Sequence, residues 1–189
     1  MKKIVVPLVA IAAVSISAAA TAQGYVSLDA GTGHVGIGCP EGLSCKTNPV
    51  AIKVIGGYEL GHGLAAEVGY VDFGKAKVRG SGGELGFRGQ AVTFGLAYQA
   101  KFNQDWALTM RLGLARVKGT ASADMYGSSD SGGFYTGSDS STQLYSGIGA
   151  NYTLAQNVKL QLGVDFSRGK YSTESVAVHA ITAGVRYSF

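Results

Sequence analysis

Apolar and other residues alternate along most of the chain. Between positions 158 and 167, Val, Leu, Leu, Val and Phe alternate with Lys, Gln, Gly, Asp and Ser, and residues 92–99 and 106–115 follow the same pattern. Because successive side chains of a β-strand point to opposite faces, the alternation predicts strands with one apolar face. The second face is mostly Gly, Ala, Ser and Thr, which is typical of the crowded interior of a narrow barrel whose outside contacts lipid.

The strand pattern divides the chain into eight segments. They cover residues 24–35, 50–59, 64–73, 89–100, 106–117, 141–152, 158–167 and 177–189. The short connections are 60–63, 101–105 and 153–157, and the long ones are 36–49, 74–88, 118–140 and 168–176. Outer-membrane barrels have short periplasmic turns and longer extracellular loops. The sequence therefore predicts an all-β fold, an eight-stranded antiparallel transmembrane β-barrel with both ends in the periplasm.

The N-terminus has the pattern of a secretory signal peptide. Lys2 and Lys3 precede an apolar run over residues 4–16, and a small-x-small site ends at Ala22. This pattern predicts cleavage between Ala22 and Gln23, which separates a signal peptide (1–22) from an outer-membrane barrel domain (23–189). An uncleaved anchor is the alternative, but the run is short beside the roughly 20 apolar residues of a spanning helix.

The composition favours a membrane barrel over a soluble domain. Charged residues make up 15% of the chain, below the roughly 25% that is usual for soluble domains. The formal net charge of +4 falls to +2 when the two lysines of the signal peptide are removed. This balance gives no reason to expect nucleic acid binding. An exported β-sandwich remains the alternative, and the alternation of short and long connections favours the barrel.

The two cysteines, Cys39 and Cys45, are close in the sequence. Because exported proteins fold in an oxidising compartment, we expect a disulfide that closes the first long loop. Zinc binding is the alternative, but only His34 lies nearby and a structural zinc site needs about four ligands. We expect neither a metal ion nor a cofactor.

The C-terminal strand ends in an aromatic residue. Gly184, Tyr187 and Phe189 form a Gly-x-x-Tyr-x-Phe ending, the signature by which the barrel assembly machinery recognises its substrates. The alternative is an ordinary edge strand that ends in Phe.

This ending and the Ala-Glu-Val-Gly-Tyr-Val-Asp-Phe-Gly stretch at 66–74 give the chain its family resemblance. The sequence resembles small outer-membrane β-barrels related to the transmembrane domain of outer membrane protein A and to opacity-like surface proteins. The resemblance implies adhesion or immune evasion, because opacity-like relatives engage host surfaces or serum factors. The loops, rather than the barrel, would carry such a role.

Charged residues also occur on the inward register of the predicted strands. They are Asp29, Lys53, Glu59, Glu67, Lys101, Arg111, Lys159, Asp165 and Arg186. The interior of an eight-stranded barrel is just wide enough to be filled by side chains, so buried charges there must pair. We expect a lumen network of Lys53, Glu67, Arg111, Asp165 and Arg186, in which Glu67 pairs with Arg111 or Arg186. A narrow, gated ion path through the same residues is the alternative.

Two long loops have distinctive compositions. Lys75, Lys77, Arg79 and Arg88 make the second loop basic. We expect it to contact lipopolysaccharide phosphates, and a dedicated site for an anionic host polymer is the sharper alternative. The third loop, 118–140, is rich in Gly, Ser and Asp and is predicted to be mobile without a packed core.

These observations support three functional hypotheses. The first is a structural and surface-interaction protein that contacts outer-membrane lipid, lipopolysaccharide and a host surface ligand. The second is a narrow channel for ions or small solutes. The third, a lipid A-modifying enzyme, needs a nucleophile, a base and an acidic residue that orients the base. His179 could supply the base, and Ser172, Glu174 and Ser175 lie in the adjoining loop. However, Ile181 replaces the serine of the His-x-Ser pattern of lipid A deacylases, so we expect no enzyme.

Overall fold

In the computed structural model, residues 24–36, 44–46, 48–80, 83–125, 134–171 and 174–189 are described, and they form nine strands. The strands are β1 (Gly24–Val35), β2 (Ser44–Lys46), β3 (Val50–Gly61), β4 (Leu64–Gly80), β5 (Gly83–Lys101), β6 (Trp106–Met125), β7 (Phe134–Ala155), β8 (Val158–Tyr171) and β9 (Glu174–Ser188). Within these residues the structure contains no helix that is long and apolar enough to cross a bilayer.

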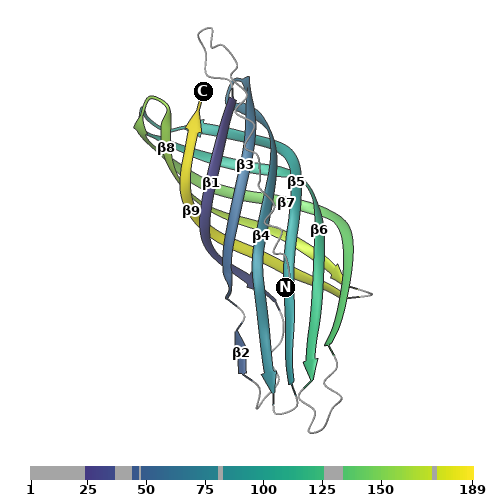
Figure 1. Cartoon of the computed structure of the whole chain (residues 1–189). Helices are drawn as coiled ribbons and strands as arrows, with labels where there is room; N and C mark the ends of the chain where they lie inside the picture. Colours follow the sequence, from purple (N-terminus) through teal and green to yellow (C-terminus); the bar gives the residue numbers. More distant parts are fainter. Residues whose placement is uncertain (1–23, 37–43, 47, 81–82, 126–133, 172–173) are drawn as a thin grey trace, which may run out of the picture.

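Strands β1 and β3–β9 close into an antiparallel barrel, which confirms the predicted fold (Figure 1). The sheet order is β4-β3-β1-β9-β8-β7-β6-β5, and pairing between β4 and β5 completes the cylinder. The first and last strands, β1 and β9, pair with each other from Tyr25↔Ser188 to Val35↔Val178. Closure gives each barrel strand two hydrogen-bonded neighbours, which a bilayer requires because it offers no water to unpaired backbone groups.

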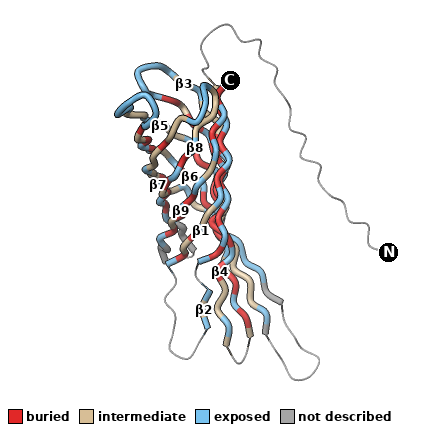
Figure 2. The backbone as a smooth tube through the Cα atoms, turned by 90° about the vertical axis from the view of Figure 1, so that its left-hand side faces the viewer, coloured by how far each residue is buried: buried red, intermediate tan, exposed pale blue. Residues whose placement is uncertain are grey.

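The burial of the side chains follows the predicted alternation (Figure 2). Leu112 and Phe94 are 61% and 69% exposed and face outward, whereas Lys53 and Asp165 are each 1% exposed and face the lumen. The outward set is therefore the surface that lipid covers, and the inward set fills the barrel.

The predicted boundaries at the extracellular end are wrong. Residues 74–88 and 118–140 were expected to be loops, but most of their described residues are paired strand. Gly, Ser and Asp carry little strand propensity, yet the backbone ladders continue past the membrane because each strand has a neighbour to pair with. The short strand β2 was also not predicted, and it pairs with β4 at Cys45↔Val78.

The barrel wall divides at this end. The ladder between β7 and β8 stops at Ser146↔Phe166; the described residues beyond it pair only with β6 on one side and with β9 on the other. Strands β4–β7, with β2 on the β4 edge, continue as a separate sheet (Figure 1). We call this part, residues 44–46, 75–80, 83–90, 116–125 and 134–142, the extracellular sheet.

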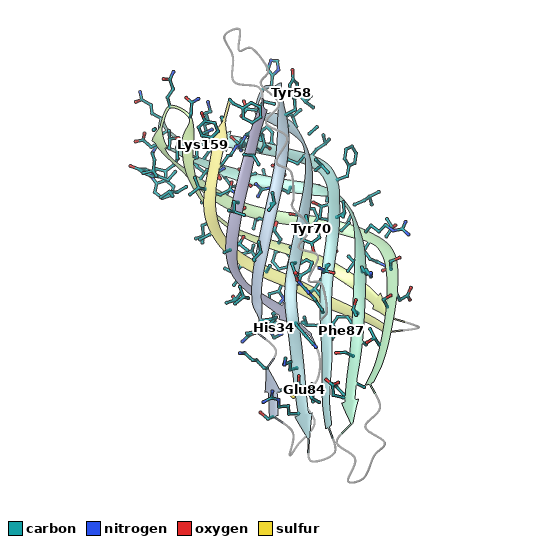
Figure 3. All side chains as sticks on the ribbon, in the orientation of Figure 1. His34, Tyr58, Tyr70, Glu84, Phe87 and Lys159 are labelled. Atoms are coloured by element: carbon teal, nitrogen blue, oxygen red, sulfur yellow. The ribbon has the colours of Figure 1, made fainter. Side chains whose placement is uncertain are left out.

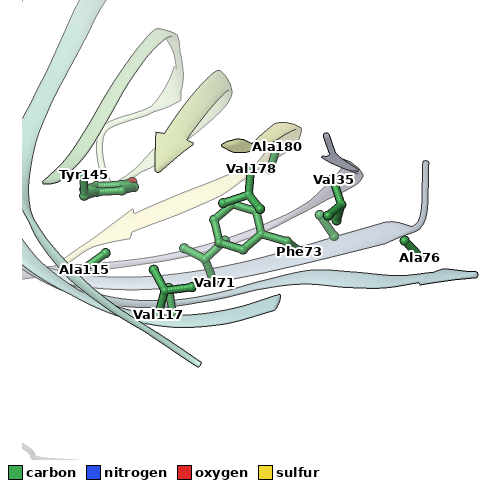
Figure 4. Packing of buried hydrophobic residues seen from close by; sticks show 11 residues of the cluster. Val35, Val71, Phe73, Ala76, Ala115, Val117, Tyr145, Val178 and Ala180 are labelled. Atoms are coloured by element: carbon green, nitrogen blue, oxygen red, sulfur yellow. The ribbon is translucent and has the colours of Figure 1, made fainter. Parts of the chain in front are cut away.

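A β-bulge marks the start of the extracellular sheet. The β4–β5 register shifts between Asp72 and Gly74, and Gly74 has a φ of 83°, a conformation that favours glycine. The extra residue, Phe73, is fully buried. It packs in an apolar cluster, the Phe73 layer, that fills the extracellular half of the lumen (Figure 4). The layer includes Val35, Val71, Val117 and Val178.

Candidate functional site

The centre of the lumen contains a buried ion pair between β4 and β6. Arg111 Nε donates to Glu67 Oε2 at 2.8 Å, and the Tyr25 hydroxyl donates to Glu67 Oε1 at 2.6 Å. Both carboxylate oxygens therefore have a partner, which offsets the cost of burying the charge. Of the two arrangements expected for Glu67, the structure has the one with Arg111.

A second buried pair lies between β3 and β8. Lys53 Nζ donates to Asp165 Oδ2 at 2.6 Å, and the Tyr145 hydroxyl donates to Asp165 Oδ1 at 2.5 Å. Asp29, the register partner of Lys53, accepts from Gln161 Nε2 at 2.8 and 2.9 Å. With their two tyrosines, the pairs link six strands across the lumen, β1, β3, β4, β6, β7 and β8.

Arg186 contacts the Glu67 cluster through the ring of Tyr25 and forms its own ion pair with Glu59. Its Nη2 donates to Glu59 Oε1 at 3.1 Å, and its guanidinium carbon lies 3.3 Å from the centroid of the Tyr25 ring. Among the described residues it forms no ion pair with Glu67, which is paired with Arg111. Lys101 and Lys159, which were also predicted to face inward, form no ion pair within this part of the chain.

The outward face of the extracellular sheet carries cations. Four of them, Lys75, Arg88, Arg116 and Lys118, form the surface that we call the basic face. Arg88 pairs with Asp72, but the other three form no ion pair among the described residues. Arg116 and Lys118 line a cavity of about 360 Å³, and the other lining residues are Val92, Ser138, Asp139 and Ser140.

Two further cations of the sheet share one carboxylate. Glu84 accepts from Lys77 Nζ at 2.7 Å and from Arg79 Nε at 2.6 Å. These hydrogen bonds lower the pKa of Glu84 to about 2. Glu84 lies far from Lys159, which is at the opposite end of the barrel (Figure 3). Lys77 and Arg79, predicted as members of a basic loop, therefore belong to an ion-paired strand surface.

The imidazole ring of His179 stacks on that of His34. Its ring lies 4.7 Å from that of His34, its register partner, and His34 Nδ1 lies 2.8 Å from Asn48 Oδ1. Ser172 is outside the described residues, and the side chains of Glu174 and Ser175 are not described. Within the described residues, no cluster of three or more His, Cys, Asp or Glu side chains could hold a metal ion.

The residues of the expected assembly signal lie at the closing pair of strands, β1 and β9. A Cβ atom on Gly184 would lie 2.2 Å from the Leu28 carbonyl oxygen, so the two backbones approach too closely for any side chain there. Phe189 N donates to the Gly24 carbonyl oxygen at 2.9 Å, and Tyr187 faces outward.

The remaining predicted sites fall partly outside the described residues. Cys45 is disulfide-bonded, but its expected partner Cys39 is not described. The cleavage site between Ala22 and Gln23 is also outside the described part of the chain.

Comparison with known proteins identifies the fold. A family model described as the outer membrane protein beta-barrel domain matches residues 6–189. No match was found among curated protein sequences. The crystal structure of neisserial surface protein A has a TM-score of 0.60 and 22% identity, covering 88% of this chain and 97% of that chain.

Two structures of the attachment invasion locus protein Ail of Yersinia pestis are also similar. The first has a TM-score of 0.56 and 18% identity, covering 88% of this chain and 99% of that chain. The second, a complex with the heparin analogue sucrose octasulfate, has a TM-score of 0.51 and 20% identity, covering 87% and 99%. At these identities the similarity shows the fold alone.

Proposed function

This chain belongs to the outer membrane protein β-barrel domain family, and on that basis we propose that it is a non-conducting surface-interaction protein. Its barrel anchors the extracellular sheet in the outer membrane, and the basic face of that sheet binds anionic polysaccharide. The observation that carries the proposal is the position of Lys75, Arg116 and Lys118, which are exposed, outside any ion pair of the described residues, and held on paired strands beyond the apolar band.

The arrangement suits a ligand with repeated sulfate or phosphate groups. Arg116 and Lys118 are two residues apart on β6, so they point the same way, and Arg88 and Lys75 are register partners on the adjacent strands. A row of cations on one strand face raises the local concentration of a polyanion and forms charge-assisted hydrogen bonds with it. The Ail complex with a heparin analogue is a precedent within the same fold.

The filled lumen supports a non-conducting barrel over the alternative of a narrow channel. An ion would have to pass the Glu67–Arg111 and Lys53–Asp165 pairs and then the Phe73 layer. Protein interiors are close-packed and contain few voids larger than a water molecule, so these buried layers favour a closed lumen. The proposal includes no enzymatic activity.

Three further assignments complete the proposal. Residues 1–22 are removed on export, Cys39 and Cys45 form a disulfide, and the barrel assembly machinery recognises the ending that contains Gly184, Tyr187 and Phe189. The position of the last three residues where β1 meets β9 supports recognition of an unpaired β9 before the barrel closes.

Binding to immobilised heparin tests the central proposal. The refolded barrel, in zwitterionic nanodiscs without lipopolysaccharide, is compared with the Arg116→Gln, Lys118→Gln double variant. The matched control is Lys101→Gln, Lys159→Gln, which removes the same charge at the periplasmic end. We expect the first variant to bind about tenfold more weakly, since each exposed ion pair contributes up to about 1 kcal/mol.

The control should bind like the wild type, and affinity should fall as salt screens the charges. If both double variants lost the same heparin affinity, the binding would depend on net charge alone. That result would contradict a dedicated binding site on the basic face. Added lipopolysaccharide that abolishes heparin binding would instead identify the envelope's own phosphates as the ligand of the basic face.

A further inference from the structure

Three cations meet at the periplasmic mouth, the end of the barrel that holds the short turns. Lys159 on β8 and Arg186 on β9 are direct register partners, and Lys101 ends β5 on the inward register. Like charges directly opposite each other destabilise a sheet. The Lys159–Arg186 pair is therefore an electrostatic cost that the folded barrel retains.

The neighbouring side chains compensate this charge only in part. Glu59 Oε1 accepts from Arg186 Nη2 at 3.1 Å, and Glu59 is the one carboxylate among the described residues that line the mouth. Lys101 and Lys159 form no ion pair within the described chain. Three cations against one carboxylate leave two positive charges without a partner.

The buried cation of this group also lacks a hydrogen-bond partner. Arg186 is 0% exposed, and its Nε has no acceptor among the described residues. The Gln99 carboxamide, with its oxygen turned toward the guanidinium, accepts from Nη1 and Nη2 but does not reach Nε. A buried donor without an acceptor costs free energy comparable to a lost hydrogen bond, so it calls for a ligand or water.

The same residues surround a cavity of about 560 Å³. Figure 3 shows Lys159 at the end of the barrel that also carries Tyr58. The lining includes Leu64 and Tyr98, which are register partners exposed on the outward face. The cavity therefore extends from the charged lumen over the rim to the surface that faces lipid.

We propose that the periplasmic mouth is a binding site for a phosphate oxyanion, held by Lys101, Lys159 and Arg186. A phosphate has several acceptor oxygens, which can accept hydrogen bonds from the ammonium groups of Lys101 and Lys159 and from Arg186 Nε. Glu59 keeps its hydrogen bond with Arg186 Nη2. Two sources share this chemistry. One is the headgroup of a phospholipid in the periplasmic leaflet, with its chains against Leu64 and Tyr98, and the other is a free phosphate compound of the periplasm.

The test uses the refolded full-length mature chain in uncharged maltoside micelles that contain no phosphate. Inorganic phosphate is added, or sodium chloride at the same ionic strength, and the Arg186 Nε–H resonance and the melting temperature Tm are recorded. The same resonance is recorded in phosphatidylglycerol nanodiscs. We expect a phosphate-specific shift of the resonance, and a rise in Tm because a ligand that binds only the folded state stabilises it.

A shift with inorganic phosphate identifies a free phosphate site, and a shift in nanodiscs alone identifies a lipid headgroup. No shift in either medium, or equal shifts with chloride, overturns the proposal. The Lys101→Gln, Lys159→Gln variant should lose the shift and, without phosphate, melt no lower than the wild type, since repulsion is relieved. The matched control, Arg116→Gln, Lys118→Gln, should keep the shift. A shift that survives in the first variant also overturns the proposal.

Discussion

Glu67 and Arg111 form an ion pair inside the barrel although they lie on strands that are not neighbours. Glu67 is on β4, Arg111 is on β6, and the register partner of Glu67 on the intervening β5 is Gly95. A Cβ atom on Gly95 would lie 2.4 Å from the carbonyl oxygen of Leu112 on β6, so β5 and β6 approach closely here. Across this glycine Arg111 Nε reaches Glu67 Oε2 at 2.8 Å.

Removing one partner of this pair should destabilise the barrel strongly. Glu67→Ala leaves Arg111 buried without its counter-ion, which costs about 3–5 kcal/mol. Urea unfolding of the barrel in lipid vesicles measures the change. Replacing both residues, as Glu67→Leu with Arg111→Met, should restore most of the loss, whereas the exposed control Lys118→Ala should change stability by about 0.5 kcal/mol or less. A mild effect of Glu67→Ala would mean that water hydrates the lumen.

The filled lumen predicts that planar bilayers containing the folded wild-type barrel show no unitary currents. Glu67→Ala should also stay silent, because the Phe73 layer still closes the extracellular half. The double variant Glu67→Ala, Phe73→Ala removes one residue of the Glu67–Arg111 pair and one of the Phe73 layer. Of these variants it is the one that we expect to conduct ions most readily. Reproducible wild-type currents that change in Glu67→Ala would favour the channel hypothesis and make the inward charges a gate.

The sequence predicts the membrane part of the fold well for a physical reason. Lipid and lumen impose opposite demands on successive residues, so Leu162 and Asp165 reveal their faces by alternation alone. Beyond the bilayer water reaches the strands, and residues such as Ser138 and Ser140 carry no such signal. The same absence concealed β2, whose three residues form a strand only because β4 offers an edge.

The pairing inside the lumen was only partly predictable. Period two places Lys53, Glu67 and Arg186 on the inward face, but the shear of the barrel decides which of them lie at the same height. The bulge at Phe73 was missed because the Phe-Gly step was interpreted as the end of a strand. Tyr25 and Tyr145 were also missed as hydrogen-bond donors to the carboxylates, and their position on the inward register was the available signal.

Acid should weaken the extracellular sheet locally. Hydrogen bonds from Lys77 and Arg79 lower the pKa of Glu84 to about 2 from an ordinary value of 4.5. The ion pairs therefore contribute their full stabilisation above pH 4.5, and the contribution is lost as the pH falls through about 2. Carboxyl NMR titration of Glu84 and hydrogen exchange of its neighbours measure the change. The Lys77→Gln, Arg79→Gln variant should titrate near 4.5, and a wild-type midpoint there would contradict the paired geometry.

The C-terminal aromatic residue should matter for assembly in cells more than for stability. Phe189→Ala should reduce the fraction of folded, heat-modifiable protein in the outer membrane, while refolding from urea into detergent changes little. The control is Phe102→Ala, which removes an exposed aromatic residue at a periplasmic turn. If both variants had the same folded fraction in cells, Phe189 would not be part of the assembly signal.

Mass spectrometry of protein from the outer membrane tests the two covalent predictions together. We expect an N-terminus at Gln23 and a mass two hydrogens below that of the reduced chain, because Cys39 and Cys45 are joined. Reduction and alkylation should label both cysteines, and denaturing alkylation without reduction should label neither. An intact N-terminal segment would show that it anchors the protein, and alkylation before reduction would show free thiols.

The length of β6 and β7 makes the extracellular sheet accessible to large molecules outside the cell. They contain 20 and 22 residues, and at about 3.3 Å per residue, tilted by roughly 40°, they rise about 50 Å, twice the roughly 25 Å apolar band. The sheet therefore stands tall enough to emerge among the saccharides that coat the outer leaflet. A large probe that the sugar layer keeps away from the bilayer, such as an antibody, can therefore reach the outer ends of these described strands.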